Sequence, residues 1–298
     1  MQLKPVSKAE LNDLATLSAT RASITIAIDI AAVVGLLMLA AWSKQVLVVS
    51  LVIILIARQQ HALAILIHEG VHRRLFRSRR LNDVAARWLL AGPLFVSFDG
   101  YRRMHLRHHA YTMTSDDPDF QFVKDFPMSI GQFSKSVLHD LTGASYLFLL
   151  RHYWQGGRKE FRSIFGLLGS AVPPIAVNAL LLAACLWNGY AWVYFVCWLA
   201  PLFLVFPLLL HVRGICEHGG QEPNPDPLQC TWTVLNPIET FFVAPHNINY
   251  HMEHHAFPAV PQFNLPKLHR LLAASGSLPT ENIHRSYWTI LKTLIVPR

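Results

Sequence analysis

Apolar residues gather in four long blocks of the chain, and short polar turns separate the blocks within each pair. The blocks cover residues 22–42, 46–67, 163–187 and 190–210. A helix needs about 20 apolar residues to cross a bilayer, and each block has that length. The turns at 43–45 and 188–189 leave room only for a tight reversal. The pattern predicts an all-α membrane protein with four transmembrane helices in two hairpins.

The polar segments and the composition agree with this prediction. The chain is 52% hydrophobic and 15% charged, whereas soluble domains carry about 25% charged residues. Segment 68–162 holds 15 of the 26 Lys and Arg residues, and the two turns hold only Lys44. Basic loops stay on the cytoplasmic side. We therefore expect both termini and segments 68–162 and 211–298 to be cytoplasmic, the latter two forming a helical cap.

The whole chain, 1–298, is expected to be one multi-pass membrane domain, in the inner or plasma membrane if the protein is bacterial. The net charge of +8 is explained by this asymmetry together with anionic lipid headgroups. No basic stripe accompanies a nucleic-acid-binding motif, so no nucleic-acid partner is expected.

Nine histidines lie in four clusters of the cytoplasmic segments, and two clusters repeat the spacing H-x-x-H-H. Positions i, i+3 and i+4 share one face of a helix, so each repeat is expected to direct three imidazoles at one point. Nine ligands are too many for one ion. The sequence therefore predicts a polynuclear metal centre, with no catalytic side chains beyond it. The candidate ligands are His68, His72, His105, His108, His109, His218, His251, His254 and His255.

Polar residues beside the clusters are candidates for orienting these histidines, because ligating imidazoles commonly bond to carboxylates. For the acidic run 116–119, a plain acidic turn is an equal alternative. The scattered histidines 61, 139, 152, 269 and 284 are interpreted as structural or surface residues. The candidates for orientation are Glu69, Asp119, Glu217, His246, Asn247 and Glu253.

Two other metal functions fit parts of the pattern. Residues 68–72 match H-E-x-x-H, which is typical of zinc proteases. Such a site needs only one further protein ligand and leaves both H-x-x-H-H clusters unexplained. A metal transporter would carry its ligands near the bilayer midplane, whereas these histidines lie outside the apolar blocks.

The histidine boxes, in this order and separated by paired spans, resemble those of the membrane fatty acid desaturase and hydroxylase superfamily. The resemblance covers about residues 45–275 and is sharpest at 60–69 (QHALAILIHE) and 246–258 (HNINYHMEHHAFP). It implies a non-haem centre of two iron ions (Fe²⁺/Fe³⁺) at the cytoplasmic membrane face, held by the nine histidines, with O₂ as co-substrate. The implied reaction oxidises an unactivated C–H bond of a lipid or fatty acyl chain. Desaturation is the first expectation, and a hydroxylase or ketolase reaction is the alternative.

Such a reaction draws two electrons from outside the chain. Neither a G-x-G-x-x-G fingerprint nor a His-Pro-Gly-Gly box is present in the sequence. A separate ferredoxin or cytochrome b5-type donor with its reductase is therefore expected as a partner. Arginines at 73, 74, 77, 79 and 80 suit an acidic donor, although lipid binding explains them equally well.

Overall fold

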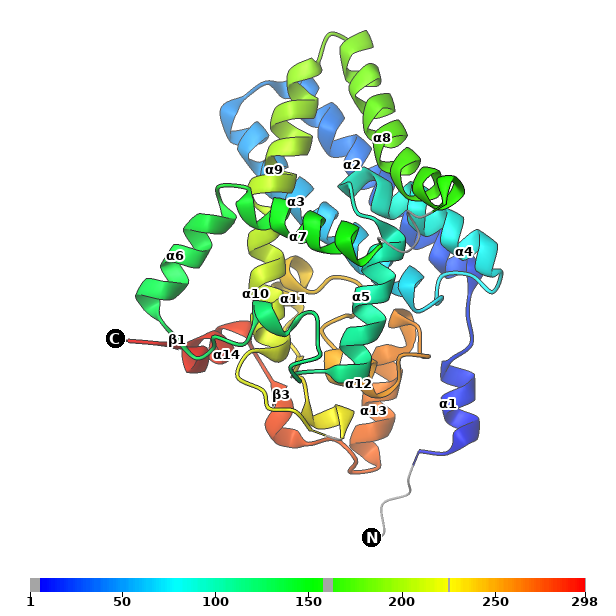
Figure 1. Ribbon diagram of the computed structural model, residues 1–298, viewed down its shortest axis with the longest axis vertical. Coiled ribbons are helices and arrows are strands. Elements are labelled where there is room, and N and C mark those ends of the chain that lie inside the picture. Colours follow the sequence, from blue (N-terminus) through cyan, green and yellow to red (C-terminus); the bar gives the residue numbers. More distant parts are fainter. Residues whose placement is uncertain (1–5, 158–162, 225, 298) are drawn as a thin grey trace. The chain divides into compact units, whose positions relative to one another are not determined.

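The computed structural model describes residues 6–157, 163–224 and 226–297, and most of them are helical (Figure 1). The chain forms two compact units. We call Ala19–Met104 with Ser134–Leu210 the span unit, and Met1–Ser18 with His105–Phe133 and His211–Arg298 the histidine unit. The expected cytoplasmic segment 68–162 ends on residues 158–162, which lie outside the described residues.

Four helical stretches are long and apolar enough to cross a membrane, which confirms the predicted number of spans. They begin and end close to the predicted bounds, but the second and fourth run further into the histidine boxes. The four stretches are Ala19–Ser43, Val46–Val71, Leu168–Trp187 and Val193–His218. The protein is therefore a multi-pass integral membrane protein.

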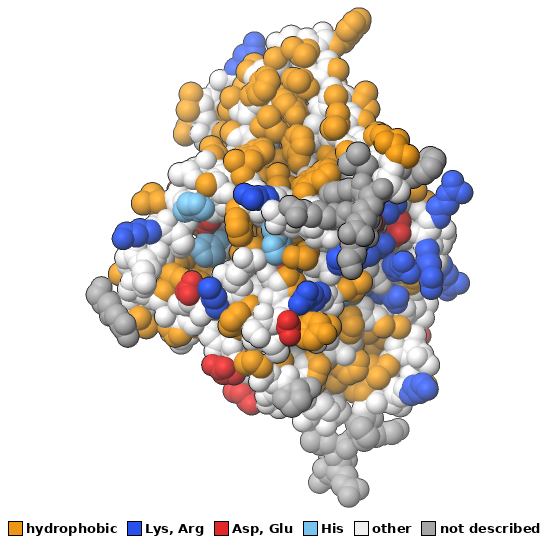
Figure 2. All heavy atoms as spheres, viewed as in Figure 1, with side chains coloured by type: hydrophobic (Ala, Val, Ile, Leu, Met, Phe, Trp, Pro, Cys, Tyr) orange, Lys and Arg blue, Asp and Glu red, His pale blue; other side chains and the backbone are white. Residues whose placement is uncertain are grey.

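In the structure the spans are α2 (Ala19–Ser43), α3 (Val46–Val71) and α8 (Ile164–Trp187), followed by a composite fourth span. The fourth span consists of η5 (Val193–Leu199), α9 (Ala200–Leu204) and α10 (Phe206–His218). Helix α2 packs against α3, and η5 packs against α8 and α9, as two hairpins require. Figure 2 shows hydrophobic side chains over much of the visible face of these spans, as expected where lipid is the solvent.

Several polar side chains inside the span unit bond to one another or to the backbone. Gln60 Nε2 donates to the carbonyl of Trp198 at 2.8 Å. Asn178 Nδ2 donates to the carbonyl of Gly92 at 3.0 Å, and its Oδ1 accepts from Trp198 Nε1 at 3.2 Å. An unpaired polar group in hydrocarbon costs several kcal/mol. These bonds therefore fix how the spans pack together.

The end of α3 is tied to the segments that follow it. Asn82 Nδ2 and Arg102 Nη2 both donate to the carbonyl of Gly70, at 2.8 and 3.1 Å. Arg102 also pairs with Asp83 at 2.5 Å. A Cβ on Gly70 would lie 2.8 Å from Cβ of Ala86, so only glycine permits this close packing. The last turn of α3, with His68 and the C-capping residue His72, is thereby held in place.

The remaining elements of the span unit are short. Helices α5 and α6 begin in one unit and end in the other. The elements are α4 (Arg79–Ala85), η1 (Ala86–Ala91), η2 (Gly92–Leu94), α5 (Phe98–Tyr111), α6 (Ile130–Asp140) and α7 (Ala144–Gly156).

The histidine unit is built from short helices and two parallel strand pairs around a small apolar core. Strand β1 pairs with β4 in the register Met128↔Ile295, and β2 pairs with β3 in the register Thr233↔Ile283. The core contains Met252 of α12 and Leu268 of α13. The elements are α1 (Lys8–Leu14), η3 (Phe120–Phe122), β1 (Met128–Ser129), η6 (Pro227–Gln229), β2 (Thr233–Val234), α11 (Pro237–Val243), α12 (His251–Ala256), η7 (Gln262–Asn264), α13 (Leu265–Ala274), η8 (Thr280–Asn282), β3 (Ile283–His284), α14 (Tyr287–Leu294) and β4 (Ile295–Val296).

Candidate metal centre

Helix α5 carries the first H-x-x-H-H box, and its three histidines divide between two groups. His105 and His109 are one turn apart, and their Nε2 atoms lie 3.0 Å from each other. His108 belongs instead with His218 and His255, whose rings lie 4.7 and 5.0 Å from its own.

Helix α12 carries the second box and divides its histidines in the opposite sense. His254 Nε2 lies 3.1 Å from Nε2 of His109. His251 and His255 are one turn apart, with their Nε2 atoms 3.1 Å from each other, and they face His108. Each box thus gives its i, i+4 pair to one group and its i+3 histidine to the other.

This division corrects the expectation that each H-x-x-H-H box aims at a single point. At 3.6 residues per turn, positions i and i+4 are about 40° apart around the axis, while i+3 and i+4 are about 100° apart. A single box therefore spreads its imidazoles over an arc wide enough for two sites.

We call His108, His218, His251 and His255 group two. Their four candidate ligand nitrogens lie within 4.8 Å of one another, and all four residues are buried, at 2–7% exposure. His218 comes from the end of α10, and its Nε2 lies 3.0 Å from Nε2 of His251. Nitrogens this close suit one metal ion, because imidazole binds first-row metals at about 2.0–2.1 Å.

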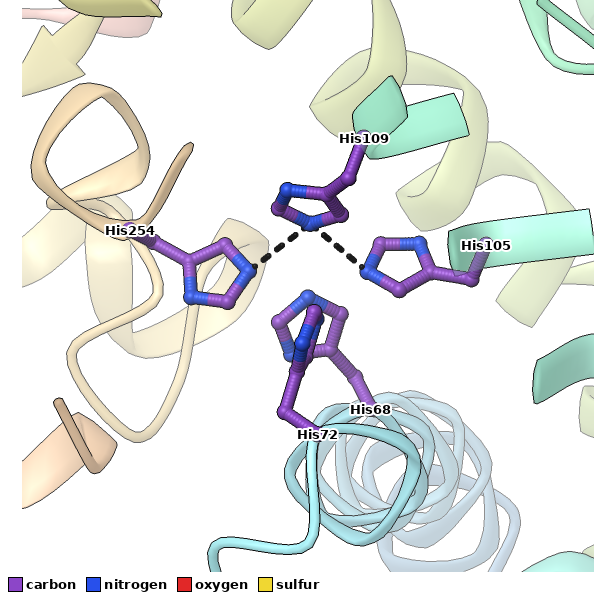
Figure 3. A group of neighbouring side chains, drawn as sticks. All are labelled: His68, His72, His105, His109 and His254. Atoms are coloured by element: carbon purple, nitrogen blue, oxygen red, sulfur yellow. Dashed lines mark hydrogen bonds between the residues drawn. The ribbon is translucent and has the colours of Figure 1, made fainter. Parts of the chain in front are cut away.

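We call His105, His109 and His254 group one. Their candidate ligand nitrogens also lie within 4.8 Å of one another, and Figure 3 shows the three rings with the two short contacts at His109. Figure 3 also shows His68 of α3 and His72, the residue that caps the end of α3. The ring centroids of these two histidines are 4.9 Å apart. All nine predicted histidines therefore occur in ligand-like pairs or groups within their own units.

Burial and nearby carboxylates act in opposite directions on the pKa values of the group-two histidines. It lowers the pKa of His251 and of His255 well below 6.5, and neighbouring histidines add to this effect. Burial alone would also lower the pKa of His108, but the hydrogen bond to Asp117 and nearby carboxylates outweigh it, so the pKa of His108 is raised. His251 and His255 are thus neutral at pH 7 and have lone pairs available for a metal.

Asp117, which sequence reasoning did not select, holds His108. Both its carboxylate oxygens lie 3.0 Å from His108 Nδ1, which leaves Nε2 for a metal. The carboxylate also accepts from the backbone N–H groups of Met113 and Asp119, at 2.9 and 2.8 Å. The predicted candidate Asp119 lies beside this pair and offers an oxygen to the same neighbourhood. The acidic run 116–119 (DDPD) indicated a carboxylate near the histidines, but the sequence did not show which of its aspartates faces inward.

Glu253 and Glu217 are both buried, and they make different contacts. Glu253 Oε2 accepts from Thr233 Oγ1 at 2.6 Å, and its Oε1 pairs with His269 Nδ1. His269, interpreted from sequence as a scattered histidine, is therefore joined to the second H-x-x-H-H box. Glu217 accepts from Arg213 Nε at 2.7 Å and approaches His251.

The other residues predicted to orient the histidines are Glu69, His246 and Asn247. Glu69 is buried at 2% exposure beside His68, and it interacts electrostatically with Arg74. His246 and Asn247 both have positive φ angles, 58° and 62°. Asn247 Nδ2 donates to the carbonyl of Gln262 at 3.3 Å, so it bonds to the start of η7.

The sequence profile described as "Fatty acid desaturase" matches residues 41–287. The chain belongs to this family. All nine histidines lie within the matched region, as the resemblance of the histidine boxes led us to expect.

Curated relatives are similar at low identity. A β-carotene 4-ketolase of Protosiphon botryoides is 23% identical over 72% of this chain and 49% of its own length. A chloroplastic omega-6 fatty acid desaturase of Glycine max is 23% identical over 76% of this chain and 57% of its own length. An sn-1 acyl-lipid omega-3 desaturase (ferredoxin) of Nostoc is 25% identical over 78% of this chain and 68% of its own length. The chain spans about half the length of the first two.

Proposed function

We propose that this protein is a membrane oxidoreductase that uses two iron ions and O₂ to oxidise an unactivated C–H bond of a lipid or fatty acyl chain, and that the reaction is desaturation. The observation that carries the proposal is the division of each H-x-x-H-H box between two groups of imidazoles. Two neighbouring ligand sets suit a paired-metal centre, whereas a zinc protease needs one.

The ligand set that we propose has two parts. His68 and His72 join group one, and group two holds the second ion. Three features support the first assignment: the i, i+4 spacing on α3, the 4.9 Å between the two rings, and the anchoring of Gly70 between them. We propose that the two units form one membrane domain around this centre.

The protein's own groups prepare such a centre. Neutral imidazoles bind iron among other first-row metals, and bound iron would supply the activation of O₂ and the removal of hydrogen. Burial of the group-two histidines keeps water away from them. Asp117 fixes the ring orientation of His108 through Nδ1, as ligating histidines commonly require.

A ketolase or hydroxylase reaction on the same centre is the second candidate. Ketolases occur among the relatives alongside desaturases, including a β-carotene ketolase of Paracoccus at 26% identity over 68% of this chain. The two reactions share the first hydrogen removal and differ in whether a second hydrogen leaves or oxygen is added. Analysis of the product separates them.

We propose an external ferredoxin or cytochrome b5-type electron donor with its reductase. The name of the Nostoc relative includes ferredoxin, and exposed Arg77, Arg79 and Arg80 follow the first histidine box in the chain. An acidic donor would be attracted to such a surface. The distribution of basic residues supports cytoplasmic placement of the termini and of the metal centre.

Metal content and lipid products test the proposal together. Detergent-purified protein should contain about two irons per chain, as a nine-histidine paired site requires. Membranes of cells that express the protein with a donor should gain a lipid with one more double bond. A keto or hydroxy product would favour the second candidate. One zinc and no iron, in protein expressed with ample iron, would contradict both.

A further inference from the structure

Helix α11 presents apolar side chains to the surface of the histidine unit. Ile238 is 77% exposed, and Phe241 and Phe242, one turn further along, are exposed as well. Leu235, just before the helix, is also exposed. Positions three and four residues apart share one face of a helix. Contiguous exposed apolar side chains mark surfaces that meet a membrane or another protein.

Helix α14 begins beside α11 and adds an exposed tryptophan. Glu239 of α11 accepts from Ser286 Oγ at 2.7 Å and from the backbone N–H of Tyr287 at 2.6 Å. Trp288, the next residue, is 58% exposed. Because these bonds join the first turns of the two helices, the exposed side chains lie on neighbouring elements. We call the following residues the apolar patch: Leu235, Ile238, Phe241, Phe242 and Trp288.

Helix α14 also packs against the end of the fourth span. Cys216 Sγ of α10 lies 3.8 Å from the carbonyl oxygen of Tyr287. A Cβ on Gly220, just after α10, would lie 2.6 Å from a side-chain carbon of Leu294. All these residues belong to the histidine unit, and the fourth span ends at His218. Helices α11 and α14 therefore lie near the point at which the chain leaves the membrane.

The charges around the apolar patch are those of a surface that meets lipid headgroups. Residues 285–297 include no acidic residue and two exposed basic ones, Arg285 and Lys292. Lys292 Nζ lies 5.2 Å from the ring centroid of Trp288. Glu239, the one acidic residue of α11, is bonded to the start of α14. Tryptophan beside basic side chains on an amphipathic helix is typical of the membrane interface.

Two other occupants of the apolar patch fit these features less well. A second copy of the chain would bring two sets of Arg285 and Lys292 together, and like charges that face each other across an interface are destabilising. An acidic protein would pair with the basic residues but would also have to cover the large aliphatic and aromatic side chains. A bilayer with anionic headgroups offers a charged surface and an apolar interior together. The four spans already hold the chain in such a bilayer.

We propose that the apolar patch inserts at the boundary between headgroups and acyl chains of an anionic phospholipid membrane, with Arg285 and Lys292 binding the headgroup phosphates. This is the membrane that the spans cross. Segment 244–250 links α11 to α12, which carries the second H-x-x-H-H box. Insertion of α11 therefore holds that box at a fixed distance from the lipid surface. The inference concerns membrane contact alone and depends neither on the metal nor on the reaction.

Photo-cross-linking identifies what covers the apolar patch in membranes of cells that express the full-length protein. The photoreactive residue p-benzoyl-phenylalanine replaces Ile238 in one variant and Trp288 in another, and the exposure of both sites leaves room for it. We expect irradiation to increase the mass of the purified chain by that of one phospholipid. The control site is Lys267, whose side chain is 55% exposed on α13 of the same unit, and it should give no lipid adduct.

Four results would overturn the proposal. They are an adduct of twice the mass of the chain, an adduct with another protein, lipid labelling at Lys267 equal to that at Ile238, and no adduct at either patch site. The first would assign the apolar patch to a second copy, and the second would assign it to a protein partner.

Vesicles test the two basic residues. Protein with p-benzoyl-phenylalanine at position 238 is reconstituted into mixed phosphatidylcholine and phosphatidylglycerol. We expect the share of phosphatidylglycerol among the adducts to exceed its share of the mixture, because basic side chains concentrate anionic lipid near them. Arg285→Gln combined with Lys292→Gln should remove this excess, whereas Lys267→Gln should keep it. Adducts in proportion to the mixture before these substitutions, or an excess that survives the double substitution, would overturn the assigned headgroup contact.

Discussion

His108 and His109 are consecutive residues whose imidazoles belong to different metal-ligand groups. His109 Nε2 lies 3.1 Å from Nε2 of His254, whereas the ring of His108 lies 4.7 Å from that of His218. Successive residues point about 100° apart around a helix. A single turn of α5 can therefore supply ligands to two neighbouring sites.

The separation of the two groups predicts distinct effects of His108→Ala and His109→Ala. Each variant removes a ligand from one group, so we expect the iron content to fall from about two toward about one per chain in each. Mössbauer spectra of the ⁵⁷Fe-loaded variants should lack different subspectra. Loss of the same subspectrum in both variants would contradict the division of the box.

Asp117→Asn tests the contact that orients His108. The amide keeps the shape but removes the negative charge at Nδ1, and loss of such partners typically weakens metal binding about 10–100-fold. Asp116→Asn is the matched control, because Asp116 pairs with Arg107 at an exposed site, and such pairs contribute about 0–1 kcal/mol. Metal affinity from chelator competition measures both. Equal affinities of the two variants would argue against a role for Asp117.

His269→Ala tests the link between α13 and the second H-x-x-H-H box. Removing the imidazole leaves Glu253 Oε1 buried without this partner, which we expect to cost about 1–3 kcal/mol of unfolding free energy. Lys267→Ala, on the same helix, removes an exposed pair with Asp13 and should change stability by less than about 1 kcal/mol. Thermal unfolding in detergent compares the two. A His269→Ala protein as stable as Lys267→Ala would show that the pair contributes little.

Gly70→Ala tests the packing that holds His68 and His72. The added methyl would meet Ala86 Cβ at 2.8 Å, and overpacking of this kind typically costs about 1–3 kcal/mol. Gly35→Ala in α2 is the control, because its Cβ would meet nothing within 4 Å. We expect Gly70→Ala alone to lower both the melting temperature and the iron content. A Gly70→Ala protein that is destabilised but keeps its normal iron content would contradict a role of this packing in holding the metal site.

The stability of the metal-free protein should depend on pH in a defined direction. The pKa values of His251 and His255 are lowered by folding, so the unfolded chain binds more protons at these two residues below about pH 6.5. Stability rises with pH wherever the unfolded state binds more protons. The pKa of His108 is raised by folding. This residue therefore binds more protons in the folded state and reduces the gain in stability with rising pH.

We therefore expect these histidines to make metal-free protein less stable at pH 5.5 than at pH 7.5. Unfolding of the wild type and of His255→Gln at both pH values measures how much these histidines contribute to the change in stability. Because one histidine with a lowered pKa is gone, the variant should show a smaller loss of stability on acidification. An equal or larger loss in His255→Gln would contradict this account.

The sequence alone determined the spans and the ligand candidates. Hydrophobic blocks predict membrane helices because lipid cannot hydrogen-bond to the backbone, so length and composition decide the four spans without knowledge of their neighbours. The histidine spacing likewise depends only on the helical repeat. The family resemblance rests on the same local motifs and agrees with the matched region 41–287.

Only the tertiary structure decided how the histidines and their supporting residues are divided. The pairing of His109 with His254 joins residues 145 positions apart, and that of Glu253 with Thr233 joins residues 20 apart. The choice of Asp117 at His108 depends on how a loop folds back onto α5, and the approach of Glu217 to His251 depends on the packing of α10 beside α12. Helical periodicity shows which side chains share a face, but partners across the fold are chosen by packing and by the need to pair buried charges.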